Sequence, residues 1–67
     1  MGGNYIIFIK ENTYFAGWGI FGEMKTIGNR DLAYRFSRPL AERNLPKLVQ
    51  EFGTECKIEA LKEGIAV

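Results

Sequence analysis

The sequence predicts a small α+β domain, in which a mainly antiparallel sheet of three to four strands packs on one helix in the order β-β-β-α-β. Two observations lead to this prediction. Short segments rich in β-branched and aromatic residues alternate with turns before residue 30, and one segment with helical periodicity follows at 37–53. A chain of 67 residues, 46% of them hydrophobic, has room for one domain, which we expect to span 1–67 with flexible ends at 1–3 and 64–67.

The helix is expected between Ser37 and Gly53. Serine is a favoured N-cap residue, and glycine ends helices because it adopts a positive φ without strain. Residues spaced three or four apart form one apolar stripe: Ala41, Leu45, Leu48, Val49 and Phe52. Pro46 lacks the N–H that would bond the carbonyl of Glu42, which costs roughly 3 kcal/mol. We therefore expect a kink near Asn44 or two short helices in series, and favour the kinked single helix because the stripe runs through the proline.

Four segments have the composition and alternation of strands: 4–10, 13–19, 23–27 and 54–61. The first is apolar on both faces, which is typical of a central strand or of one whose second face meets a partner. In the last, Cys56, Ile58 and Ala60 alternate with charged residues and are expected to face inward.

The connections are predicted by turn-forming residues. Glu11-Asn12 indicates a two-residue hairpin turn, and the glycines on either side of Trp18 indicate a bulge or a close approach of the backbone. Ile20-Phe21-Gly22 forms the second turn. Asn29 caps a single helical turn, after which residues 34–36 return to an extended conformation before the helix.

The layout YIIFIK–EN–TYFAGW, followed by TIGNRDLAYRF and a capped helix, resembles small uncharacterised proteins of bacteriophages and prophages. These often begin with a Tyr-rich hairpin and carry an Ala-x-x-Phe step before a Ser-x-x-x-Ala helix start. The matching residues are Ala33, Phe36, Ser37 and Ala41. The resemblance implies a phage or prophage source and an accessory role in the cytoplasm of the bacterial host, through binding to a host protein or to nucleic acid. The family has no established activity to carry over.

The side chains that most catalytic sites need are scarce. The chain has no histidine, one serine, one cysteine and one aspartate, so no Ser-His or Cys-His pair is available. No clustered ligands indicate a metal site, and no cofactor is expected. Gly17–Gly22 spells GxGxxG, but a strand follows it where a nucleotide site needs a helix. The sequence therefore predicts a protein without enzymatic activity.

Aromatic side chains gather in the first hairpin and in the turn that follows it. One helix covers one face of a sheet, so we expect the other face to lie open or to meet another molecule. Exposed aromatic residues on a hairpin are typical of protein-binding surfaces and homodimer interfaces. The leading hypothesis is binding and modulation of a host protein, with a hydrophobic contact and a polar rim formed by these residues: Trp18, Phe21, Tyr14, Arg35, Arg38 and Arg43.

Two other functions stay open. Basic residues exceed acidic ones between 30 and 47, which suggests a nucleic-acid-binding module that uses Arg35, Arg38, Arg43 and Lys47. The other is a self-assembling structural subunit. A net charge of +1 provides no global attraction to nucleic acid or to anionic lipid, and no apolar run approaches the roughly 18 residues of a membrane span. A single cysteine favours the reducing cytoplasm.

Overall fold

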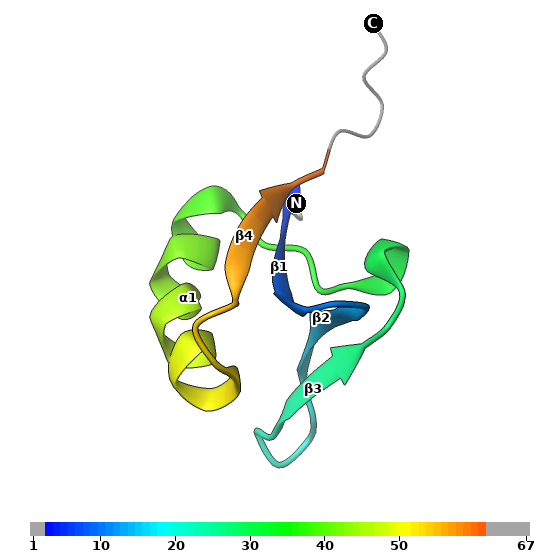
Figure 1. Ribbon diagram of the computed structural model, residues 1–67, viewed down its shortest axis with the longest axis vertical. Coiled ribbons are helices and arrows are strands. Elements are labelled where there is room, and N and C mark those ends of the chain that lie inside the picture. Colours follow the sequence, from blue (N-terminus) through cyan, green and yellow to red (C-terminus); the bar gives the residue numbers. More distant parts are fainter. Residues whose placement is uncertain (1–2, 62–67) are drawn as a thin grey trace, which may run out of the picture.

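The computed structural model describes residues 3–61 as a four-stranded antiparallel sheet with one α-helix against one face (Figure 1). The sheet has the strand order β3-β2-β1-β4. In chain order the elements are β1 (Tyr5–Lys10), β2 (Thr13–Trp18), β3 (Met24–Ile27), the 3₁₀ turn η1 (Arg30–Leu32), α1 (Arg38–Phe52) and β4 (Lys57–Ala60). The predicted fold class and the order β-β-β-α-β are confirmed. Of the ends predicted to be flexible, residues 1–2 and 64–67 lie outside the described residues.

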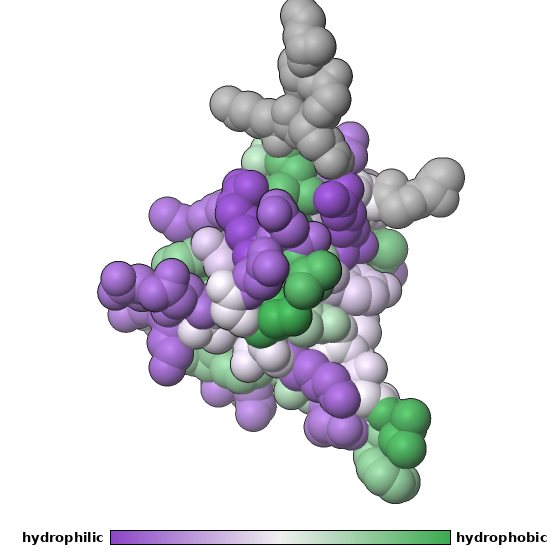
Figure 2. Space-filling view, turned by 90° about the vertical axis from the view of Figure 1, so that its right-hand side faces the viewer, coloured by the Kyte–Doolittle hydropathy of each residue, from purple (hydrophilic) through white to green (hydrophobic). Residues whose placement is uncertain are grey.

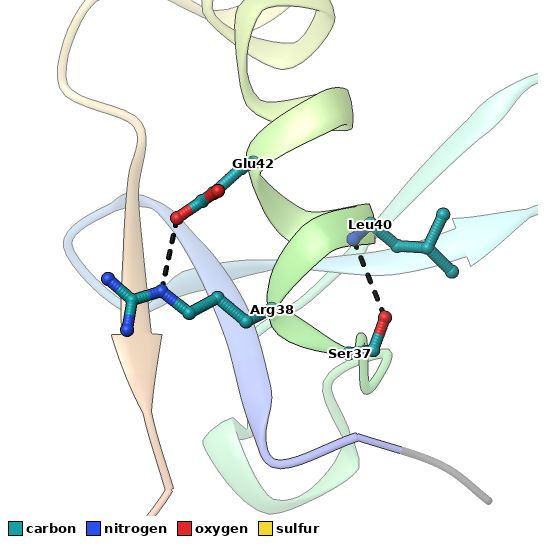
Figure 3. Close-up of polar contacts among 4 residues, drawn as sticks. All are labelled: Ser37, Arg38, Leu40 and Glu42. Carbon is teal, nitrogen blue, oxygen red and sulfur yellow. Dashed lines mark hydrogen bonds and ion pairs between the residues drawn. The ribbon is translucent and has the colours of Figure 1, made fainter.

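Both ends of α1 are capped as the sequence predicts. The Ser37 hydroxyl accepts a hydrogen bond from the backbone N–H of Leu40 at 3.4 Å (Figure 3). Gly53 has a φ of 124°, and its N–H donates to the carbonyl of Val49 at 2.8 Å. These bonds satisfy backbone groups that a helix end leaves without an intrahelical partner.

The helix continues through Pro46 as a single element, so the alternative of two short helices is wrong. Asn44 does not cap a second helix, because its side-chain amide donates to the carbonyl of Leu40 at 2.9 Å. The predicted apolar stripe faces the sheet: Ala41 and Leu48 are buried, and the other stripe residues pack against the core. Packing of this stripe against β1 and β4 therefore outweighs the proline.

The core lies between α1 and the sheet. It consists of these buried residues: Ile7, Ile9, Phe15, Phe36, Ala41, Leu48 and Cys56. The thiol of Cys56 donates to the carbonyl of Leu48 at 3.5 Å, and burial raises the pKa of this thiol. Cys56 therefore faces inward, as its alternation predicted, and packs as a small apolar residue.

The last strand is shorter than the predicted 54–61. Thr54 and Glu55 form a turn, closed by the N–H of Cys56 on the carbonyl of Gly53 at 3.4 Å. Strand β4 begins at Lys57, and its four residues pair with the first four of β1. The chain uses 53–56 to reverse from the helix onto the sheet, so these residues are not available for pairing.

The sheet face turned away from α1 is partly covered by η1. The sequence predicted this helical turn but not the surface that it covers. The cap of this turn is as expected, since the Asn29 carboxamide oxygen accepts from the N–H of Asp31 at 2.9 Å. Arg30 reaches from η1 to Glu59 of β4, with 3.2 Å between Nη2 and Oε1. Ile6 pairs with Glu59, shares its face, and has no exposed surface. The expectation of an open face is therefore wrong at Ile6.

The segment from Tyr34 to Phe36 connects the two sides of the sheet. The N–H of Tyr34 donates to the carbonyl of Phe15 in β2 at 2.9 Å. Phe36 and Tyr5 of β1 form two backbone hydrogen bonds, each N–H donating to the carbonyl of the other residue. The segment thus bonds to both strands as it passes from η1 to α1. It also contacts Gly3, where a Cβ atom would collide with the carbonyl of Phe36.

Candidate protein-binding surface

Four aromatic rings form a cluster that extends from the core to the surface, and we call it the aromatic cluster: Phe15, Trp18, Tyr34 and Phe36. Every pair among them has ring centroids between 4.8 and 6.3 Å apart. Phe15 and Phe36 are buried, whereas Trp18 is 43% and Tyr34 42% exposed. Most pairs meet edge to face, a geometry that contributes about 0.5–1.5 kcal/mol beyond area burial. The cluster anchors the end of β2 to the segment before α1.

A bulge in β2 makes this cluster geometrically attainable. The register with β3 shifts between Phe15 and Gly17, so Phe15 and Trp18, three residues apart, reach the same side. Gly17 has a φ of 107°, and a Cβ built there lies 3.0 Å from Cδ1 of Tyr34. The predicted bulge near Trp18 is therefore confirmed, and glycine is required for both backbone conformation and space.

Gly17→Ala is expected to destabilise the protein by about 1–3 kcal/mol, because it strains the backbone and displaces Tyr34. Urea unfolding followed by circular dichroism measures the loss. Gly22→Ala is the matched control, since Gly22 also has a positive φ but nothing within 4 Å of its built Cβ. A Gly17→Ala variant no less stable than Gly22→Ala would show that the contact with Tyr34 contributes nothing.

The hairpin tip, which we define as residues 19–22 between β2 and β3, presents two large hydrophobic side chains to solvent. Ile20 is 91% and Phe21 88% exposed. Figure 2 shows the apolar atoms of this tip protruding at the lower end of the molecule. The turn is closed by the N–H of Gly22 on the carbonyl of Gly19 at 3.0 Å, and the carboxylate of Glu23 accepts from the N–H of Phe21 at 3.1 Å. The tip is thus an exposed apolar surface on a hydrogen-bonded turn.

The structure separates the residues that the sequence assigned to one interface. Trp18 and Phe21 share the β2–β3 hairpin, whereas Tyr14 pairs with Phe8 on the sheet face away from α1. The aromatic cluster adds Tyr34, which was not among the residues predicted for the protein-binding surface. Ile20 is another residue that the sequence analysis did not select. An apolar pair between glycines in a predicted turn was the signal that could have identified it.

The arginines lie elsewhere. In Figure 1, α1 begins at the upper end of the molecule and the hairpin tip lies at the lower end. Arg38, in the first turn of α1, pairs with Glu42 at 3.1 Å between Nε and Oε2 (Figure 3). This hydrogen bond and the charge of Glu42 raise the pKa of Arg38. Arg43 and Lys47 are exposed along α1, and Arg35 is exposed in the segment before it. The first turn of α1, with Arg38, therefore lies at the other end of the molecule from the hairpin tip, whereas Arg35 follows Tyr34 of the aromatic cluster.

Three features that mark other kinds of site are absent from the part of the chain that the structure describes. Across residues 3–61, no three His, Cys, Asp or Glu side chains come together as a metal site would need. The surface of this same part has no pocket. Among its helices, none combines the length and the apolar composition of a membrane span. The protruding hydrophobic tip is an exposed apolar surface on these described residues.

No protein-family model, curated protein or solved structure matches this chain.

Proposed function

We propose that this protein is a non-enzymatic binding protein, and that its hairpin tip inserts Ile20 and Phe21 into an apolar pocket of a partner protein. The supporting observation is the exposure of both side chains on a hydrogen-bonded turn. Fully burying one such side chain contributes about 1.5–3 kcal/mol. The pair therefore offers a partner about 3–6 kcal/mol, with little loss of backbone freedom because the turn is already formed.

The shape of the tip favours a different protein over a second copy of this chain. Two protruding side chains need a complementary hollow, and residues 3–61 contain no pocket. A stable dimer buries about 800 Å² on each partner, whereas a large aromatic side chain supplies roughly 150–250 Å². The tip alone is too small for a homodimer interface or for a self-assembling subunit. A partner that encloses the tip in a pocket would supply the additional buried surface area that a stable interface needs.

The resemblance to phage and prophage proteins extends this proposal to the identity of the partner. The partner would be a protein of the bacterial host, met in its cytoplasm, and binding would modulate its activity. Trp18 at the base of the hairpin contributes to the contact. The proposal does not depend on Arg35, Arg38 or Arg43.

Affinity capture from bacterial lysate tests the proposal, with half of each sample treated with nuclease and the retained proteins identified by mass spectrometry. We expect one protein to be retained after nuclease treatment, and the double variant Ile20→Ser/Phe21→Ser to lose it by at least about tenfold, since two anchor residues are removed. Because both side chains are exposed, the double variant should keep its stability to within about 0.5 kcal/mol per substitution.

Leu32→Ser is the matched control, because Leu32 is an exposed hydrophobic residue in η1 rather than on the hairpin. It should retain the partner as the unmodified protein does. Equal retention by the double variant would contradict the tip as the contact. Recovery of nucleic acid, with the proteins lost on nuclease treatment, would favour the nucleic-acid-binding alternative.

A further inference from the structure

A row of side chains crosses all four strands on the sheet face turned away from α1. Phe8 of β1 is registered with Lys57 of β4 on one side and with Tyr14 of β2 on the other. Tyr14 is registered in turn with Ile27 of β3. Residues directly opposite each other share a face of an antiparallel sheet. We call these four residues the cross-strand row; three strand spacings give it a length of about 14 Å.

The row combines aromatic rings with positive charge. The rings of Phe8 and Tyr14 lie 5.9 Å apart at 72°, and both side chains are half-buried. The ammonium of Lys57 lies 5.2 Å from the centre of the Phe8 ring. Lys25, two residues before Ile27 on β3, is exposed on the same face. Two lysines thus flank two aromatic rings on one surface.

Two carboxylates close to the row are engaged in contacts of their own. Glu59, on the same face, is paired with Arg30 at 3.2 Å. Glu23, two residues before Lys25, is directed into the hairpin tip, where it accepts the N–H of Phe21. Figure 2, viewed from the side of η1, shows hydrophilic side chains gathered around a paler and more apolar middle on this side of the molecule.

We propose that the cross-strand row binds single-stranded nucleic acid, with a base stacked on Tyr14 and phosphates bound by Lys25 and by Lys57, whose ammonium lies over the ring of Phe8. Stacking on aromatic side chains beside a basic track is the general mode of single-strand binding without sequence preference. A ligand that alternates flat rings with negative charges matches both features of the row. This site is independent of the hairpin tip, and it lies on the opposite side of the sheet from the α1 residues that the sequence analysis selected for nucleic acid.

Fluorescence anisotropy with labelled oligothymidylate and oligouridylate tests this site between about 50 and 200 mM salt. Tyr14→Leu keeps an apolar side chain but removes the ring, and should weaken binding about 5- to 150-fold, the range that corresponds to 1–3 kcal/mol per stacked base. Lys25→Gln/Lys57→Gln should reduce the slope of log affinity against log salt by about 1.4, or 0.7 for each phosphate contact.

The matched control is Arg43→Gln/Lys47→Gln, which removes two exposed positive charges from α1. It should leave the affinity and the salt dependence close to those of the unmodified protein. Absence of binding at the lowest salt would overturn the proposal, as would an equal loss in the control variant. Displacement of the oligonucleotides by polyglutamate at matched charge would also overturn it, because polyglutamate carries charges without bases. None of these outcomes depends on the partner captured by the hairpin tip.

Discussion

Replacing Phe15 with alanine is expected to destabilise the fold by about 3–5 kcal/mol, the usual cost of removing a buried phenyl ring. Phe15 has no exposed surface and contacts each of the other three rings of the aromatic cluster. A domain of this size has a total stability of roughly 3–10 kcal/mol. Phe15→Ala should therefore unfold much of the population at 25 °C, as measured by urea unfolding with far-UV circular dichroism.

Two control variants test whether the buried ring of Phe15 anchors the aromatic cluster. Phe15→Leu keeps most of the apolar volume and should lose less than Phe15→Ala. Trp18→Ala removes a larger ring, but Trp18 is partly exposed, so we expect a smaller loss of stability than at Phe15. If Trp18→Ala were the more damaging of the two, the cluster would be anchored from its surface side and not from the core.

Ile6→Ala is expected to lose about 2–5 kcal/mol, the range for a fully buried aliphatic residue. Ile6 lies on the sheet face away from α1, and the loss would therefore measure how well η1 covers that face. An exposed isoleucine at the same position would lose at most about 0.5 kcal/mol. Urea unfolding distinguishes these two outcomes directly.

The control for Ile6→Ala is a variant of the ion pair between Arg30 and Glu59, the residue registered with Ile6. Arg30→Gln breaks a partly exposed pair with Glu59 and should lose only about 0–1 kcal/mol. Ile6→Val, which removes one methyl group, should lose about 0.5–1.5 kcal/mol. A loss below 1 kcal/mol in Ile6→Ala would contradict the covered face and restore the expectation of an open one.

Several features of this fold were predicted from residues close together in the chain. The caps at Ser37 and Gly53 and the hairpin turn with a φ of 58° at Asn12 depend on the backbone preferences of those residues themselves. The cap at Asn29 depends on a hydrogen bond to a residue two positions away. These caps and turns depend on residues only a few positions apart, so they can be predicted from the sequence directly.

The candidate sites depended on contacts between distant residues. Strict alternation along β2 would place Phe15 and Trp18 on opposite faces, and the bulge between them reverses this. The sequence indicated a bulge near Trp18, but not the cluster with Tyr34 and Phe36 that the bulge permits. The separation of the arginines from the hairpin tip likewise follows from where α1 begins on the sheet (Figure 1).

The sequence by itself determined the α+β class, the helix, the turns and the shortage of catalytic side chains, because these follow from residue types and their local spacing. Only the tertiary structure decided that Ile6 is buried on the face away from α1, that Ile20 and Phe21 protrude together, and that Phe8, Tyr14, Ile27 and Lys57 form one row. Which side chains share a surface depends on strand register, because a shift of one residue moves every side chain of a strand to the other face. It also depends on contacts between distant segments, such as the ion pair between Arg30 of η1 and Glu59 of β4.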